Sequence, residues 1–262
     1  KMAMGFRLLL QSRSASAAAA LRGHNASSSA SSQPEFERLQ SGLLLAALPH
    51  DRATVRVTLG FQAGARHESS VAAATGVSHA LRRAAGLSTR RYTEHGLSRV
   101  VSQMGAQLDA QTDRELLLYS LGVRRDHLAT GARVLAQVST EPEFFPWELS
   151  TLAEQLNLDI DLLARHDQTA QLLELVHEAA FLPGAAGGGL ANSLYCSPHR
   201  VASVLSTDAL AQFRAARCVA SQATLVGHGL DLEELREVAH QHFGALLAPN
   251  NTGDAAAAAS SA

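Results

Sequence analysis

His79 lies in the segment GVSHALRRAAGL (76–87), with Arg82 and Arg83 three and four residues later. On a helix, positions i, i+3 and i+4 share one face. Histidine, glutamate and histidine at this spacing would place two zinc ligands beside a carboxylate able to take a proton from the metal-bound water. Arginine has no lone pair to donate and stays positively charged, so Arg82 and Arg83 cannot ligate zinc and would repel it. The segment therefore has the spacing of a zinc-binding helix, but of the three residues that such a helix would need only the first histidine is present.

Two other pairs of residues could in principle form a site, and helix geometry argues against both. Ser78 could act as a nucleophile with His79 as its base, but adjacent helical residues diverge by about 100°, which excludes direct proton transfer. His240 and His242 are two residues apart, about 200° around a helix, so they point to different faces. The sequence shows no set of four donors that would hold a structural zinc. We predict no catalytic, metal-binding or cofactor-binding residue.

Four further residues are not predicted to form a site. His177, in the apolar segment LELVHEAAF, is predicted to lie in the core or at an interface rather than to catalyse. Trp147 follows Pro146 at a predicted helix start, and packing is favoured there over an exposed interface position. Cys196 and Cys218 lie outside any CxxC pattern and are predicted to be free thiols in a reducing compartment.

Composition limits the classes of protein to which the chain can belong. Its 262 residues are 46% hydrophobic and 18% charged, with a net charge of −2. This length and composition are sufficient for a sizeable core. The charge is too small to indicate binding to nucleic acid or to an anionic membrane. Apolar runs such as 42–48 and 114–122 are shorter than the roughly 18 residues of a spanning helix, so membrane association would have to come through partners.

The first residues resemble a mitochondrial transit peptide in composition. Residues 1–34 contain Lys1, Arg7, Arg13 and Arg22, many serines and alanines, and no acidic residue. We expect a leader or disordered segment over 1–36, and the alternative is an Ala/Ser-rich tail without targeting function. The other end of the chain, 248–262, is low in complexity and predicted to be unpacked.

Between these ends the residues alternate between strand and helix patterns. Every second residue from Val55 to Phe61 is apolar, which predicts a strand over 53–61 with one buried face. The segment 42–48 is predicted to pair with it through a turn at 49–51. Helices are predicted over 70–85, 93–104, 125–138, 146–165, 167–181, 207–213 and 232–243, and further strands within 106–123 and over 220–229.

This order predicts an α+β fold in which helices cover one face of a mostly antiparallel sheet. The elements are expected to form a single domain over 37–247. The helix at 207–213 is expected to be capped by Thr207 or Asp208. The segment PGAAGGG (183–189) is predicted to be a loop insertion.

Several segments, in order, resemble the inverzincin-type (pitrilysin) metallopeptidase family. AGARHE (63–68) resembles the family's Ala-Gly-Ser-Arg-x-Glu turn, GVSHALRRAAGLST (76–89) its signature helix, and MGAQLDAQTDRE (104–115) its Gly-Ala-x-Leu-x-Ala-x-Thr-x-Arg-Glu hairpin. The resemblance covers about 37–245. The segments SHALRRAAGLST, FFPWEL, LELVHEAAF and LANSLYCS resemble the core-two branch of the family, found in respiratory complex III, more than its active peptidases.

The family's ligands are only partly present. Active members have His-x-x-Glu-His on the signature helix and a third ligand, a Glu, on a later helix. His79 matches the first ligand, whereas Arg82 and Arg83 replace the catalytic Glu and the second His. An ungapped alignment places Ile160 at the third position, with Asp159 and Asp161 beside it. A shift of one residue would supply a carboxylate but would not restore a site with one surviving ligand.

The resemblance implies an inactive, metallopeptidase-like subunit rather than an enzyme. Such a subunit is peripheral, lies on the matrix side of the mitochondrial inner membrane, and binds a core-protein-one-like subunit and other complex III subunits, without nucleic acid or a cofactor of its own. One alternative is the non-catalytic α-type subunit of the mitochondrial processing peptidase, which binds presequences. Family members have two homologous domains and this chain resembles the first, so a truncated product, a half-length paralog and a non-functional fragment remain open.

Overall fold

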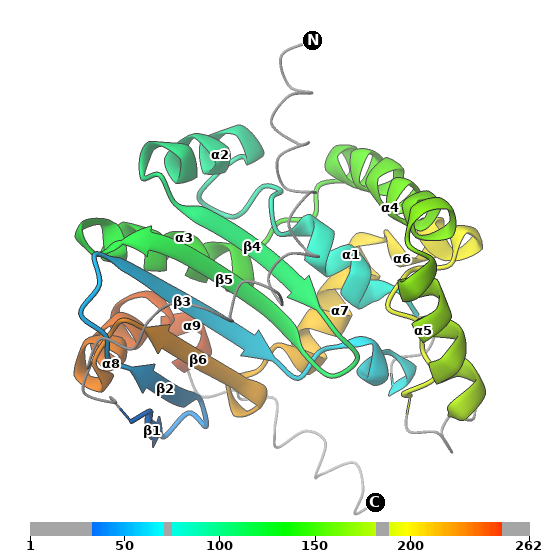
Figure 1. The fold of residues 1–262 in the computed structure, drawn as a ribbon. Coiled ribbons are helices and arrows are strands. Elements are labelled where there is room, and N and C mark those ends of the chain that lie inside the picture. Colours follow the sequence, from blue (N-terminus) through cyan, green and yellow to red (C-terminus); the bar gives the residue numbers. More distant parts are fainter. Residues whose placement is uncertain (1–32, 71–74, 182–188, 248–262) are drawn as a thin grey trace, which may run out of the picture. The chain divides into compact units, whose positions relative to one another are not determined.

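In the part of the chain that the structure describes, six strands form one mixed sheet in the order β1-β2-β6-β3-β5-β4 (Figure 1). Four of the five neighbouring pairs are antiparallel, and only β2 and β6 run parallel. The computed structural model describes residues 33–70, 75–181 and 189–247. The strands are β1 (Glu35–Arg38), β2 (Leu44–Leu48), β3 (Thr54–Phe61), β4 (Gln107–Thr112), β5 (Leu117–Arg124) and β6 (Ala223–His228).

Alternation along the central strands determines which face of the sheet is buried. Val55, Val57, Leu59 and Phe61 of β3 are fully buried, as predicted, while Arg56 is exposed. The neighbouring β5 has the same alternation, and α3 and α8 pack on this face (Figure 1). The predicted α+β architecture, a mostly antiparallel sheet with helices on one face, is confirmed.

The helices in chain order are α1 (Val77–Ala84), α2 (Glu94–Gln103), α3 (Leu128–Thr140), α4 (Pro146–His166), α5 (Gln168–Ala180), α6 (Val201–Val204), α7 (Thr207–Arg217), α8 (Leu232–His242) and α9 (Gly244–Leu247). Short 3-10 turns occur at Ala65–Ser70, Arg125–His127, Pro198–Arg200 and Ala220–Gln222. Within these described residues, no helix is both long and apolar enough to cross a bilayer.

The predicted hairpin between 42–48 and 53–61 is wrong. β6 lies between β2 and β3, parallel to β2 and antiparallel to β3. The short connection between β2 and β3 favours direct pairing of these two strands. Instead β6 lies between them, where residues such as Leu225 are buried in the core. Gly227 of β6 allows α8 to pack closely against this strand, because a Cβ at this position would lie 3.0 Å from a Leu235 methyl group on α8.

Two helix starts also differ from prediction. α1 begins at Val77 rather than near residue 70, because Gly76 has a left-handed backbone (φ 100°) and ends the preceding turn. α7 is capped by Ser206, whose hydroxyl accepts a hydrogen bond from the Ala209 amide, and not by Thr207 or Asp208. Residues 1–32 of the predicted leader (1–36), the segment 182–188 and the tail 248–262 lie outside the described residues. The end of the predicted leader is wrong, because Glu35 and Phe36 belong to β1 and pair with β2.

Candidate functional site

The signature helix α1 is held at its N-terminus by a buried carboxylate. Glu68, 1% exposed, accepts hydrogen bonds from the Gly76 amide at 2.7 Å and from the Ser78 amide at 2.8 Å. The Ser78 hydroxyl also donates to it. Burial raises the pKa of Glu68 to about 7, against the opposing effect of these hydrogen bonds. The Ser78 hydroxyl therefore binds Glu68 and not His79, which agrees with the prediction that Ser78 and His79 do not form a catalytic pair.

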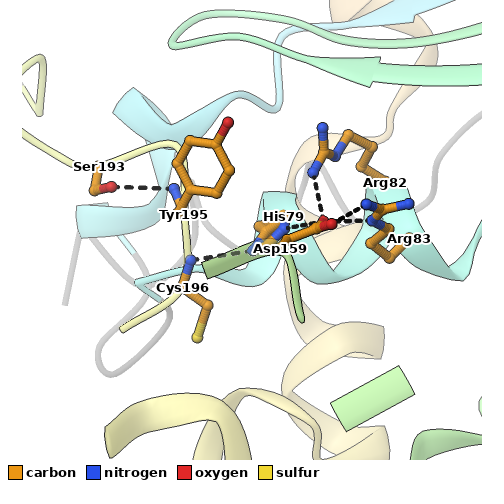
Figure 2. A network of polar contacts seen from close by, with 7 residues as sticks. All are labelled: His79, Arg82, Arg83, Asp159, Ser193, Tyr195 and Cys196. Carbon is orange, nitrogen blue, oxygen red and sulfur yellow. Dashed lines mark hydrogen bonds and ion pairs between the residues drawn. The ribbon is translucent and has the colours of Figure 1, made fainter. Parts of the chain in front are cut away.

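His79 is completely buried, and both of its ring nitrogens have a hydrogen-bond partner (Figure 2). The Cys196 amide donates to Nδ1 at 3.1 Å, so Nδ1 is an acceptor and the ring proton must be on Nε2. Nε2 then donates to Oδ2 of Asp159 at 3.0 Å. Burial lowers the pKa of His79, which keeps the ring neutral in this tautomer. The lone pair that a metal would need on Nε2 is replaced by a proton directed at a carboxylate.

Asp159 comes from the buried face of α4 and joins this helix to α1. It follows Leu149, Leu152 and Leu156, all buried, at helical spacing. Its carboxylate accepts a hydrogen bond from Arg82 Nη2 at 3.1 Å and two from Arg83, through Nε and Nη2. One carboxylate therefore binds a neutral histidine and two guanidinium groups.

The charges of this cluster explain the pKa values. Burial opposes ionisation of Asp159, but the hydrogen bond from His79 and the hydrogen bond and charge of Arg83 outweigh it and lower the pKa to about 2. Burial and the like charge of Arg83 lower the pKa of Arg82. Asp159 is thus ionised at neutral pH and serves as the shared counter-ion of both arginines.

This geometry corrects the alignment of the third family position. Asp159, and not Ile160, faces the signature helix, while Asp161 is exposed and forms a 3.8 Å ion pair with Arg165. Helical periodicity in the sequence could have identified Asp159. It is the single acidic residue that continues the spacing of the buried Leu149, Leu152 and Leu156. The structure also decides the role of the arginines, because Arg82 and Arg83 bind a carboxylate on α4.

The residues at these positions do not fit zinc. A metal bound here would need the Nε2 lone pair of His79 and would lie beside two permanent positive charges. Asp159 is the only other donor at the family positions, and it is already bound by three side chains. Among the described residues, no group of three or more His, Cys, Asp or Glu side chains is arranged to hold a metal ion.

The remaining candidate residues are dispersed over the fold. His240 is exposed on α8, whereas His242 is half-buried and its Nε2 has no hydrogen-bond partner among the described residues. Cys196 and Cys218 are free thiols, as predicted. Trp147 is 67% exposed and stacks on Phe145 with ring centroids 4.6 Å apart, so its prediction as a packing anchor is wrong.

Sequence reasoning missed Tyr195 and the cavity beside it. The Tyr195 ring meets His79 edge-on, with centroids 5.3 Å apart, and lines a cavity of about 430 Å³. The tip of the β4–β5 hairpin and one side of α5 form the rest of its wall, where Arg114 pairs with Glu174 at 3.1 Å. His177 lies in this wall rather than in the core.

Helix α5 turns its polar side toward the body of the domain and its apolar side outward. Glu174 binds Arg114 and accepts a hydrogen bond from the Leu194 amide on the inner side. No residue of α5 is classed as buried. Large apolar side chains of α5 are more than half exposed: Leu172, Leu173, Leu175 and Val176. Helix α5 therefore exposes apolar surface in this structure.

Comparison of the sequence with known proteins identifies the family to which this domain is similar. The family model "Insulinase (Peptidase family M16)" matches residues 45–196. Cytochrome b-c1 complex subunit 2 of Rattus norvegicus is 31% identical over 207 residues, which cover 79% of this chain and 44% of that protein. The probable mitochondrial-processing peptidase subunit alpha-1 of Arabidopsis thaliana is 26% identical over 208 residues, covering 79% of this chain and 40% of that protein.

A solved structure supports the fold independently. The crystal structure of a protease from Helicobacter pylori superposes with a TM-score of 0.69 at 15% identity, covering 82% of this chain and 50% of the other. This chain spans less than half the length of the curated relatives named above. The predicted resemblance to the core-two branch is confirmed by the higher identity to subunit 2. The chain belongs to the insulinase family of peptidases, family M16.

Proposed function

We propose that the chain is a non-catalytic subunit of the mitochondrial cytochrome b-c1 complex, equivalent to the first half of subunit 2. The observation that carries this proposal is the ion cluster on α1, where Arg82, Arg83 and Asp159 replace the chemistry of a zinc peptidase. The proposal is supported by 31% identity to subunit 2 of Rattus norvegicus. In this role the protein holds neighbouring subunits in place and does not cleave a substrate.

The outward apolar face of α5 supports a role in assembly. Leu172 and Val176 lie on the side of the helix opposite Glu174, which is bound within the domain, and Leu175 lies next to that side. Complete burial of such a side chain is worth roughly 1.5–3 kcal/mol, and these are just over half exposed, so a partner surface that covered them would regain about half of that for each. We propose a core-protein-one-like subunit and other subunits of the complex as partners, on the matrix side of the inner membrane.

The test is assembly in mitochondria. The radiolabelled full chain is imported into isolated mitochondria, and complexes are separated by native electrophoresis and captured with antibody to cytochrome c1. Capture with cytochrome c1 is expected. Capture with the β subunit of the processing peptidase instead would favour a presequence-binding α-type subunit, which has relatives at 25–29% identity. Migration of the chain without either partner would contradict both.

A pair of variants on α5 tests the interaction surface. Replacing both Leu172 and Leu175 with glutamine is expected to reduce capture at least several-fold, because it removes apolar contact area from the exposed face. Gln171→Ala on the same helix is the control and should leave capture unchanged. Circular dichroism of both proteins checks that the fold is retained. Equal capture of all three proteins would exclude α5 as the contact.

A further inference from the structure

The ion cluster on α1 has more hydrogen-bond donors than its single carboxylate can use. Asp159 Oδ2 accepts from His79, Arg82 and Arg83, and Oδ1 accepts a second bond from Arg83. Arg82 uses only Nη2 in this contact, and its Nε has no hydrogen-bond partner among the described residues. A guanidinium group carries five N–H donors in a planar fork. The Nε of Arg82 is buried, so the donors open to a ligand are those of the partly exposed end of the side chain.

The cluster also carries a surplus of positive charge. Two arginines face one ionised carboxylate, and His79 is neutral because its Nδ1 accepts the Cys196 amide. Burial, and after it the like charge of Arg83, lower the pKa of Arg82, while the charge of Asp159 opposes this shift. A buried charge without a full complement of partners is costly, and an incoming anion would relieve that cost.

Three other acidic groups face this region, and each has a partner of its own. Asp109 on β4 acts weakly on Arg82, while Asp167 and Glu174 act on Tyr195. Their partners are the Gln111 side chain for Asp109, the Ala170 amide for Asp167, and Arg114 for Glu174. These acids limit the net charge of the region, so a ligand with one negative charge fits better than one with two.

We propose that the former metal position is a carboxylate-binding site that accepts an acidic side chain of a peptide segment through Arg82. The Arg82 side chain is 26% exposed, and in Figure 2 its guanidinium group and the Tyr195 hydroxyl both project above α1. The site therefore selects acidic peptides and repels basic ones, the reverse of a presequence-binding cleft.

The test uses the full chain and a terminally blocked pentapeptide with one central glutamate. Isothermal titration is expected to show saturable binding, and the same peptide with glutamine or lysine at the centre should not bind. Arg82→Gln is expected to weaken binding about tenfold or more, since a charge-assisted pair is lost. Arg99→Gln, an exposed arginine on α2, is the matched control and should bind as the wild type does.

A second variant and a spectroscopic signal keep the test decisive if Arg82→Gln fails to fold. Arg82→Lys keeps the charge beside Asp159 but loses the planar fork, so it should fold and bind more weakly. In the wild type, the Arg82 Nε–H resonance should move on titration with the glutamate peptide. Inorganic phosphate is expected to bind no more tightly than the peptide.

Three outcomes would overturn the proposal. These are no saturable binding of the glutamate peptide, equal binding of the glutamine peptide, or equal affinity in the Arg82 and Arg99 variants. Tighter binding of inorganic phosphate than of the glutamate peptide would be a fourth such outcome and would overturn the proposal of a peptide carboxylate as the ligand. Because all these measurements use the isolated protein, failure here would not affect the proposed assembly with the cytochrome b-c1 complex.

Discussion

Asp159 determines the chemistry of the former metal position, because one buried carboxylate neutralises part of the charge of two arginines and fixes the tautomer of His79. Buried ion pairs contribute little net stability when complete, but removal of one partner leaves a charge without compensation. The cluster is therefore sensitive to the loss of its carboxylate.

The first prediction concerns this carboxylate. Asp159→Asn is expected to lower the free energy of unfolding by about 2–3 kcal/mol, less than for a fully buried pair because both arginines are more than one quarter exposed. Asp161→Asn, two residues along α4 in an exposed ion pair, should change it by less than about 0.5 kcal/mol. Urea unfolding measures both. Equal losses would show that the cluster contributes no more than a surface pair.

Glu68 gives a second prediction, for pH. Its folded-state pKa of about 7 lies above the ordinary value of 4.5, so the folded state binds the proton more tightly than the unfolded state. This tighter proton binding adds up to about 3 kcal/mol to the free energy of unfolding below pH 4.5. The added stability is lost as the pH rises from 4.5 through 7. The free energies of unfolding of the wild type and of Glu68→Gln, measured with urea at a series of pH values, should diverge between pH 4.5 and pH 7. Parallel pH profiles would contradict the raised pKa.

Helices α1 and α4 retain the arrangement of a metal site although two side chains prevent metal binding. His79 and Asp159 already meet at 3.0 Å, and Arg83 is one turn beyond His79 on the same face. The backbone therefore still brings three positions to one point.

Restoring the missing side chains tests that statement. The double variant Arg82→Glu with Arg83→His supplies a second histidine and a general base, and with His79 and Asp159 it should bind zinc near one equivalent. Competition with a chromophoric chelator measures the affinity. Adding His79→Ala to the double variant is the control and should abolish binding. Failure of the double variant to bind would show that α1 and α4 no longer hold a metal geometry.

The domain depends on a late segment of the chain that packs against α1. The Cys196 amide binds His79, Arg200 donates to the Thr75 hydroxyl at 2.7 Å, and Asn192 donates to the Ala65 carbonyl at 2.9 Å. These contacts join residues more than 100 positions apart. They orient α1, so the candidate site is a product of the whole fold and not of one helix.

Gly76 is the point of closest approach in this contact. A Cβ there would lie 2.7–2.8 Å from Cys196 atoms, and its left-handed backbone disfavours any other residue. Gly76→Ala is expected to lower the free energy of unfolding by about 2 kcal/mol or more. Gly86→Ala, with open space around it, should change stability by less than about 1 kcal/mol. Thermal unfolding compares them, and equal midpoints would contradict the proposed contact.

The sequence by itself determined what depends on periodicity and side-chain type. It predicted the buried face of β3, the presence of the longer helices, and two arginines on the face of α1 that carries His79. These follow from local geometry, since strand and helix periods fix which residues share a face. The tertiary structure decided what depends on distant residues: the insertion of β6 between β2 and β3, the choice of Asp159 over Ile160, the exposure of Trp147 and the outward apolar face of α5. Local patterns do not specify these because each is set by packing between segments far apart in the chain.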